Sequence, residues 1–235
     1  MGKENSQMQV VILAGGKGRR LEPITFTTPK PMIPINGRPF LQYQFELIKT
    51  FGLRKVLLLV GHLSGLVERY FGDGSKYGLG IRYSYEKTLL GTGGALKNAE
   101  DKIEDVFLLM NGDTYLSIDY KELITAFHKY GKRGLVAAYE TSDDALSNNI
   151  AISGPNLVVG YNKTNPSGMT HIDAGVSVFR KDILGLIPKG TFCSLEEEIF
   201  VKLIERKELA AFPTGQRFYD MGSRDGLKAI ERVFR

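Results

Sequence analysis

The residues best suited to chemistry lie in a glycine-rich, cationic segment near the start of the chain. Gly15, Gly16 and Gly18 fall close together, and glycine lets backbone N–H groups approach an anion without side chains in the way. The cationic residues that accompany them are Lys17, Arg19, Arg20 and Lys30. Phosphoryl transfer depends mainly on positioning and on stabilising charge. The segment therefore predicts a phosphate-binding loop.

Two well-known phosphate-binding loops do not match this segment. The dinucleotide fingerprint needs a third glycine where this chain has Leu21. The Walker loop needs a Gly-Lys-Ser or Gly-Lys-Thr string, which the chain lacks. A glycine turn after a strand also has a purely structural interpretation. The added arginines and the proline-flanked Lys30 favour the functional one.

Asp113 is the candidate metal ligand from its local context. It follows Asn111 and Gly112, directly after the apolar run 106–110. A carboxylate at the carboxyl end of a buried strand can hold Mg²⁺, which proteins bind through one or two carboxylates, substrate phosphates and water. The alternative is a turn or helix cap after a strand.

Alternating strand-like and helix-like stretches must position these residues. Continuous apolar runs predict buried strands, and apolar residues at helical spacing predict helices. In the first half they predict strands at 10–13, 55–60, 81–85, 106–110 and 135–139, and helices at 41–48, 66–71 and 123–127. Repeated β-α-β units predict an α/β fold with a Rossmann-like, mostly parallel central sheet and helices on both faces. The glycine segment then leaves the carboxyl end of the first strand, where such sheets bind ligands.

The second half shows a different, mixed pattern. Two short apolar runs flank a Gly-Pro-Asn turn and predict a β-hairpin, and a capping box at 194–197 predicts the start of a helix. The predicted elements are a hairpin over 150–159, a strand at 176–179, a helix from 194 to 204, an extended run at 212–219 and a helix at 224–234. With no internal repeat, we expect a single domain over residues 8–235.

The composition is that of an ordinary globular protein. Of 235 residues, 43% are hydrophobic and 24% charged, and the formal net charge is +5. The basic excess is mild and no run of five Lys or Arg residues occurs, which argues against a nucleic-acid partner. The charge suits an enzyme that acts on phosphorylated substrates.

Cellular location is predicted from what the chain lacks. Cys193 is the only cysteine, which excludes a disulfide framework and indicates a reducing compartment. No apolar run reaches the ~18 residues of a membrane span, and residues 1–7 lack the apolar core of a signal peptide. Residues 1–6 match the N-myristoylation pattern, which we interpret as a chance match in a disordered leader at 1–7. We therefore expect a cytoplasmic protein without a membrane partner.

Several motifs together resemble a known family. Residues 14–23 and 29–34 are similar to the signature of sugar-1-phosphate nucleotidyltransferases. The similarity extends through residues 90–95, 111–113 and 218–223, so it covers the chain from about Met8 to its end. It departs at Arg19, where threonine is common. The resemblance implies the nucleotide-diphospho-sugar transferase fold in one nucleotidyltransferase domain, without the extra β-helix domain that some relatives carry.

The resemblance also implies a reaction and a set of site residues. A sugar 1-phosphate would attack the α-phosphorus of a nucleoside triphosphate and release pyrophosphate, with no protein nucleophile. Mg²⁺ would be held by Asp113 and Asp220, while Arg20 and Lys30 would stabilise the phosphates as catalytic residues. The nucleotide would be bound by Leu13, Ala14, Gly15, Gly16, Gly18, Arg19, Glu86, Gly91, Thr92 and Gly112. The sugar phosphate would be bound by Gly93, Lys163, Asp173 and Gly175.

Base and sugar preference follow from two carboxylates. Glu86 lies where the family reads the base edge, just before a predicted loop at 91–94, and a carboxylate can accept both adjacent N–H donors of guanine. GTP is therefore favoured, with UTP or dTTP as alternatives. Asp173 occupies a position where asparagine is frequent, and acceptor-only chemistry there alters sugar preference. Residues 35–41 and 86–95 look most like heptose-1-phosphate and mannose-1-phosphate guanylyltransferases.

Two other function classes remain as alternatives. A non-catalytic nucleotide-sugar sensor could use the same fold, but it would not need the cationic and acidic residues that this chain retains. An RNA-binding protein could use the basic excess, but the chain lacks basic runs and aromatic-basic motifs. His171 is not required as a general base, because a phosphate nucleophile is already ionised. The sequence leaves the oligomeric state open, with a homo-oligomer compatible with it.

Overall fold

The computed structural model describes residues 8–141 and 146–234. The predicted leader at 1–7, with its myristoylation pattern, lies outside the described residues. A search of the described helices found none with the length and apolar character that crossing a membrane requires.

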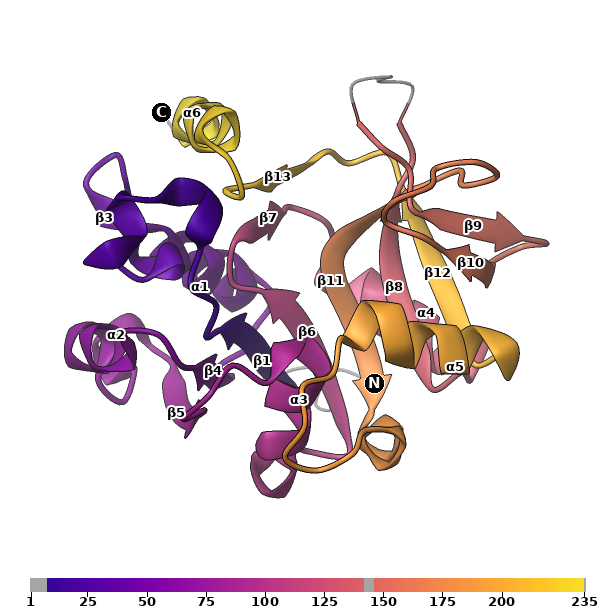
Figure 1. The fold of residues 1–235 in the computed structure, drawn as a ribbon, viewed down its shortest axis with the longest axis horizontal. Helices are drawn as coiled ribbons and strands as arrows, with labels where there is room; N and C mark the ends of the chain where they lie inside the picture. Colours follow the sequence, from indigo (N-terminus) through magenta and orange to yellow (C-terminus); the bar gives the residue numbers. More distant parts are fainter. Residues whose placement is uncertain (1–7, 142–145, 235) are drawn as a thin grey trace.

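A mixed sheet of nine strands runs through the described part of the molecule (Figure 1). In spatial order its strands are β5 (Gly80–Tyr85), β4 (Lys55–Val60), β1 (Gln9–Ala14), β6 (Val106–Asn111), β11 (Ile172–Arg180), β8 (Gly134–Tyr139), β12 (Leu209–Thr214), β10 (Leu157–Tyr161) and β9 (Ile150–Ser153). The four strands from β5 to β6 are parallel. Antiparallel pairs join β11 to both neighbours and build the β9–β10 hairpin.

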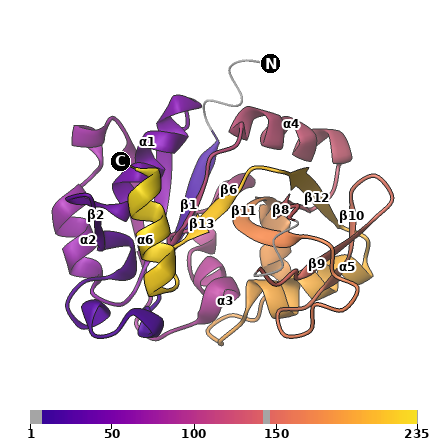
Figure 2. The ribbon, with the colours of Figure 1, turned by 90° about the horizontal axis from the view of Figure 1, so that it is seen from above.

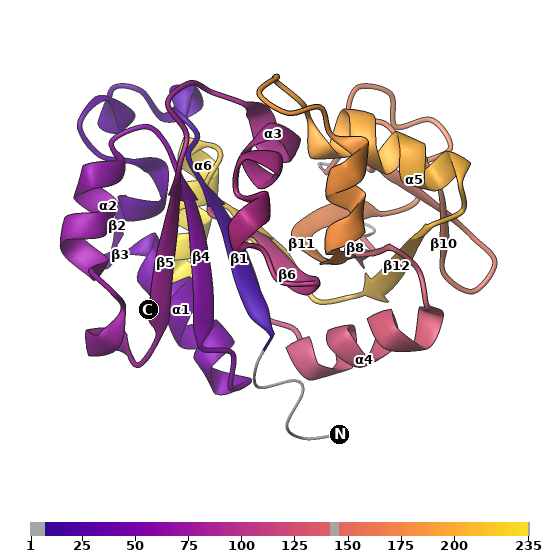
Figure 3. The same cartoon turned by 90° about the horizontal axis from the view of Figure 1, so that it is seen from below.

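The two faces of the sheet are covered by different helices. Side chains alternate between faces along a strand, so Val10 and Ile12 pack with α1 (Phe40–Thr50), α2 (Ser64–Phe71) and α4 (Tyr120–Tyr130). Val11 packs on the other face with α3 (Gly91–Asn98) and α5 (Val201–Glu205). Figure 3 shows α4 and the α3–α5 layer on opposite sides of the sheet. Each fully buried Val or Ile contributes about 1.5–3 kcal/mol to folding.

A smaller unit joins the end of the chain to its beginning. Strand β13 (Phe218–Asp220) pairs with β7 (Thr114–Leu116) just beyond β6. Helix α6 (Arg224–Val233) follows and packs against residues next to and within α1, including Ile35 and Tyr43. Figure 2 shows α6 beside α1, at the opposite end of the sequence.

The structure confirms the predicted α/β architecture and corrects three local predictions. Residues 91–94 begin helix α3 rather than a loop, although each glycine costs about 1 kcal/mol in a helix. The extended run at 212–219 is divided between β12 and β13. The helix that opens at Ser194 begins with a π-helical turn at Leu195–Phe200 before α5. Tertiary contacts override weak local propensity at each of these places.

Candidate active site

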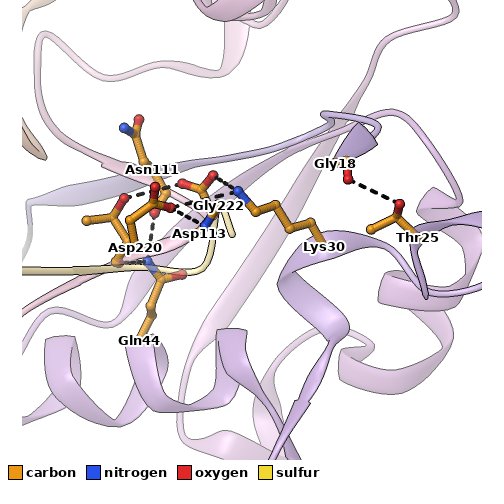
Figure 4. Close-up of polar contacts among 9 residues, drawn as sticks. Gly18, Thr25, Lys30, Gln44, Asn111, Asp113, Asp220 and Gly222 are labelled. Atoms are coloured by element: carbon orange, nitrogen blue, oxygen red, sulfur yellow. Dashed lines mark hydrogen bonds and ion pairs between the residues drawn. The ribbon is translucent and has the colours of Figure 1, made fainter. Parts of the chain in front are cut away.

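The glycine-rich segment leaves β1 and is anchored by neighbouring elements. Gly18 has a φ of 62°, a left-handed conformation that favours glycine. Its carbonyl accepts a hydrogen bond from Thr25 Oγ1 at 3.2 Å, which Figure 4 shows. The imidazole of His62 lies 3.0 Å from the Thr25 carbonyl oxygen through Nε2, and its backbone N–H donates to Gly15 at 3.1 Å. His62 therefore holds the loop at both ends.

Lys30 and two aspartates converge beside this loop (Figure 4). Lys30 Nζ donates a hydrogen bond to Asp113 Oδ2 and lies 3.8 Å from Asp220 Oδ1. The pairing of Asp220 with Thr114 across β13 and β7 brings the second carboxylate to the first. Burial raises the pKa of Asp220, the nearby Asp113 adds to the rise, and Lys30 opposes it.

The aspartate pair has the chemistry of a divalent-cation site. Two like charges so close together are costly unless a cation lies between them, and Lys30 supplies one such charge. Two carboxylates, with phosphate and water oxygens to complete the shell, suit a hard cation. No group of three or more His, Cys, Asp and Glu side chains converges in the described part of the chain. Any cation bound here would therefore depend on oxygens from a ligand or from water.

Gln44 holds the turn that carries Asp113. Its side chain is fully buried in α1, and its amide Nε2 donates to the carbonyls of Asn111 at 2.8 Å and Thr114 at 2.7 Å. Gln44 lies 67 and 70 residues away from these partners in the sequence, so no local sequence pattern predicts either bond. They fix the exit of β6 and thus the direction of the Asp113 side chain.

Arg20 lies beside Asp220. A Cβ atom added to Gly222 would lie 3.0 Å from Arg20 Cζ, which places the guanidinium against the 220–222 turn. Its charge lowers the pKa of Asp220. Arg20 thus belongs to the same cationic group as Lys30.

A pocket of about 340 Å³ opens at the carboxyl ends of β1 and β6. It brings together residues of the glycine segment, the β6 exit, helix α3 and the second half of the chain. They are Leu13, Ala14, Gly15, Gly16, Lys30, Pro31, Leu59, Glu86, Leu89, Gly91, Thr92, Ala95, Asn111, Gly112, Asp113, Lys163 and Glu196. Parallel strands present their carboxyl ends at one edge, which explains the convergence.

Glu86 lies at one wall of this pocket, against the glycine segment. Its Oε2 accepts a hydrogen bond from the Leu90 N–H at 3.2 Å. A Cβ on Gly61 would come within 2.8 Å of Oε1, so glycine backbone surrounds the carboxylate. Burial raises the pKa of Glu86, and the Leu90 bond opposes the rise.

Lys163 and Glu196 also line this pocket. Lys163 Nζ is 3.7 Å from Glu196 Oε2, and that oxygen also accepts a hydrogen bond from Thr92 Oγ1 at 2.9 Å. Asp173 is half-buried nearby, and the Gly175 N–H donates to its Oδ1 at 3.0 Å. Burial raises the pKa of Asp173 to about 6, Glu196 adds to the rise, and Lys163 opposes it.

In the part of the chain that the structure describes, some of the predicted site residues do not line this pocket. They are Gly18, Arg19, Arg20, Gly93, Asp173, Gly175 and Asp220. Arg20 and Asp220 lie beside the Lys30 cluster, as described above. Gly93 is buried against the segment before Leu195, where its N–H donates to the Cys193 carbonyl at 2.9 Å. Close packing therefore requires glycine at this position, because a Cβ there would meet Cys193 Sγ at 3.0 Å.

Comparison with known proteins identifies the family. Residues 9–149 match the nucleotidyl transferase family. A D-glycero-alpha-D-manno-heptose 1-phosphate guanylyltransferase from Aneurinibacillus thermoaerophilus is 30% identical over 226 residues, covering 96% of this chain and 97% of the relative. The chain belongs to the nucleotidyl transferase family. This agrees with the resemblance found in the sequence motifs.

Other relatives differ in length and in the nucleotide of their names. A mannose-1-phosphate guanylyltransferase from Mycobacterium tuberculosis is 34% identical over 84% of this chain and 56% of its own length. A UTP–glucose-1-phosphate uridylyltransferase from Synechocystis is 30% identical over 84% of this chain and 55% of its own length. The chain thus spans just over half the length of these two relatives.

The fold of this nucleotidyl transferase also matches solved structures. HddC from Yersinia pseudotuberculosis superposes with a TM-score of 0.85 at 28% identity, covering 97% of this chain and all of that one. A second HddC structure, complexed with GMP-PN, gives a TM-score of 0.83 over the same shares.

Among the residues of this nucleotidyl transferase site that were not predicted from the sequence as site residues, three stand out by their contacts. They are Gln44, His62 and Glu196, and each acts by a contact to a distant segment. Glu196 lies in the predicted capping box, where it was interpreted only as part of a helix start. The sequence contained no signal for its role at the site, because its burial and its bond to Thr92 are visible only in the structure.

Proposed function

We propose that this protein transfers a nucleoside monophosphate from a nucleoside triphosphate to a sugar 1-phosphate and releases pyrophosphate. The observation that carries the proposal is the convergence of Lys30, Asp113 and Asp220 beside the glycine segment. The family and the names of its relatives support the same reaction. We treat residues 8–235 as one nucleotidyltransferase domain, which the sheet shared by both halves supports.

The proposed reaction is an in-line displacement at the α-phosphorus. An oxygen of the sugar phosphate forms the new bond to phosphorus, and the bond to the bridging oxygen of pyrophosphate breaks. The attacking phosphate is already ionised, so no protein base is needed. Lys30 and Arg20 stabilise the charge on the phosphates, and the glycine segment orients the triphosphate with its backbone N–H groups.

We assign a Mg²⁺ site to Asp113 and Asp220. Their hard oxygen donors suit this ion, which commonly keeps several waters and binds substrate phosphates. When bound, Mg²⁺ would neutralise phosphate charge and so favour the departure of pyrophosphate. Lys30 forms ion pairs with both carboxylates.

We propose GTP as the favoured nucleotide and a heptose or mannose 1-phosphate as the favoured sugar. The guanylyltransferase relatives from Aneurinibacillus thermoaerophilus and Mycobacterium tuberculosis support this assignment, as does the HddC complex with GMP-PN. Glu86 in the pocket wall supports it chemically, because its carboxylate can accept two hydrogen bonds from guanine. The uridylyltransferase relative supports UTP as the alternative.

The test is pyrophosphate release from each nucleoside triphosphate with Mg²⁺ and a panel of sugar 1-phosphates. Asp113→Asn should lower turnover at least ~100-fold, because it removes a charge that the transition state needs. Asp101→Asn, at an exposed position of the short 3-10 helix Glu100–Lys102, is the matched control and should retain full activity. Circular dichroism should show the same fold for both variants.

Two results would contradict this proposal. Equal activity of Asp113→Asn and Asp101→Asn would remove Asp113 from the reaction. Tight nucleotide binding without turnover on any sugar 1-phosphate would instead support a nucleotide-sugar sensor.

We also propose a cytoplasmic location, which the use of nucleoside triphosphates as substrates supports.

A further inference from the structure

We propose that Glu196 is a specificity-determining residue that makes the sugar end of the pocket reject sugars with a second negative charge. The favoured substrates would be sugar 1-phosphates whose sugar is uncharged, and hexuronic acid 1-phosphates would be disfavoured. The inference rests on the proposed function and extends it to a residue that the sequence analysis interpreted only as part of a helix start.

Glu196 is held firmly in the pocket wall. Its side chain is only 10% exposed, and its Oε2 accepts hydrogen bonds from Thr92 Oγ1 at 2.9 Å and Ser194 Oγ at 3.1 Å. Thr92 Oγ1 in turn accepts from the Leu195 N–H at 2.8 Å. These bonds fix the carboxylate without using Oε1, which receives no hydrogen bond from the residues that the structure describes.

We assign the sugar phosphate to Lys163, as the family resemblance implies, and this assignment puts Glu196 beside that phosphate. Lys163 Nζ lies 3.7 Å from Glu196 Oε2, and both residues line the pocket with Gly91 and Thr92. Glu196 therefore pairs electrostatically with this lysine. It also leaves one oxygen free to accept a hydrogen bond from a sugar hydroxyl.

The balance of charge explains the selectivity. Lys163 is the only cation that forms an ion pair with Glu196 among the described residues, and the phosphate of the substrate would take up its charge. Glu196 and the nearby Asp173, which influence one another electrostatically, then leave the sugar surroundings negative. A carboxylate on the sugar would meet repulsion in a partly dehydrated site, where charges interact more strongly than in water.

The expected size of the effect follows from Coulomb's law. Two like charges about 8 Å apart, at an effective dielectric constant of about 20, change relative binding by roughly 30-fold. The active enzyme should therefore prefer a hexose 1-phosphate over the matching hexuronic acid 1-phosphate by at least ~30-fold in kcat/KM.

The test compares this preference between variants. The substrates are the hexose 1-phosphate that the protein uses best and the analogue with a carboxylate at C6. Glu196→Gln keeps the shape and the Thr92 bond but removes the charge, so the preference should narrow at least ~10-fold. Glu196→Asp keeps the charge and should retain the preference even if its kcat/KM is lower. Glu197→Gln is the matched control, because Glu197 is the exposed neighbour, and it should shift the ratio less than ~2-fold.

A ratio is insensitive to partial misfolding, because both substrates are measured on the same protein. An unchanged preference in Glu196→Gln, in an enzyme that turns over the hexose 1-phosphate, would overturn this inference alone. An equal narrowing in Glu197→Gln would also overturn it, because the effect would then come from general surface charge. A wild-type protein inactive on every sugar 1-phosphate would overturn the proposed function instead.

Discussion

Asp173 shows how one side chain can link the sugar site to stability. Burial raises the pKa of its carboxyl from 3.8 to about 6, although the N–H of Gly175 and the charge of Lys163 both favour the ionised form. The native protein thus keeps a proton on Asp173 at a pH where the unfolded chain has released it. Stability should fall as the pH rises from about 4 to about 6 and stay lower above that range.

Replacing Asp173 with asparagine should remove this pH dependence. Asparagine can still accept the Gly175 bond through its side-chain oxygen, and it carries no charge to bury. We expect Asp173→Asn to be more stable than the wild type by about 1–2 kcal/mol at pH 7.5, a value reduced for partial exposure. The two proteins should be about equally stable near pH 4. Urea unfolding at both pH values measures the difference.

Asp101→Asn serves as the control for this measurement. Asp101 is an exposed residue of the 3-10 helix Glu100–Lys102, far along the chain from Asp173, so its replacement should change stability by a similar small amount at both pH values. A loss of stability at pH 7.5 in Asp173→Asn would contradict the account of Asp173 as a buried, costly charge.

The glycine segment between β1 and η4 (Lys30–Met32) depends on a neighbouring element for its shape. The turn between β4 and α2 carries His62, which contacts the Thr25 carbonyl through Nε2 and the Gly15 carbonyl through its backbone. The side chain of Thr25 then binds the Gly18 carbonyl. A loop with several glycines has high conformational entropy, so such anchors lower the cost of ordering it around a ligand.

His62→Ala should therefore weaken nucleotide binding more than it weakens the fold. We expect the Kd for GTP with Mg²⁺ to rise about 5–10-fold, corresponding to about 1–1.4 kcal/mol, which is the size of one lost hydrogen bond. Isothermal titration calorimetry measures this value directly. Hydrogen exchange in residues 16–27 should accelerate at the same time.

His128→Ala is the matched control for this change, because His128 is an exposed histidine on α4. It should leave the Kd unchanged. A His62→Ala protein with wild-type nucleotide affinity would show that the loop keeps its shape without this anchor.

Helix α6 packs against helix α1 and so joins the two ends of the described chain. Phe234 stacks on Tyr43 of α1 with ring centroids 4.0 Å apart and meets Tyr115 of β7 edge-on at 4.7 Å. The N-terminal end of α6 is capped by Ser223, whose side chain accepts from the Gly226 N–H at 3.0 Å. Because α6 follows β13 directly, its docking helps to hold Asp220 beside Asp113.

Phe234→Ala should weaken the packing of α6 against α1. Loss of the two aromatic pairs and of partly buried apolar area should lower the free energy of unfolding by about 2 kcal/mol. Urea unfolding measures the change, and turnover in the pyrophosphate assay should fall as well because Asp220 is less well held. Val233→Ala removes an exposed neighbour, 42% accessible, and should cost less than ~0.5 kcal/mol. Similar losses in both variants would contradict a specific role for the aromatic contacts.

The sequence by itself determined the features that depend on neighbouring residues. Apolar runs identified the buried strands, helical spacing identified α1, α2 and α4, and the glycine segment was located at the end of the first strand. These signals are local, because burial on one face repeats every two residues in a strand and about every 3.6 in a helix. Motif resemblance added Asp220, for which the local context alone predicted nothing.

The tertiary structure alone decided how distant segments meet. It inserted β11 antiparallel between β6 and β8, paired β13 with β7, and packed the glycines of α3 against Cys193. The same long-range contacts placed Gln44, His62 and Glu196 at the site. Such pairings depend on register and packing across the whole core. The residues around a given position form no periodic pattern that would identify a contact partner far away in the sequence.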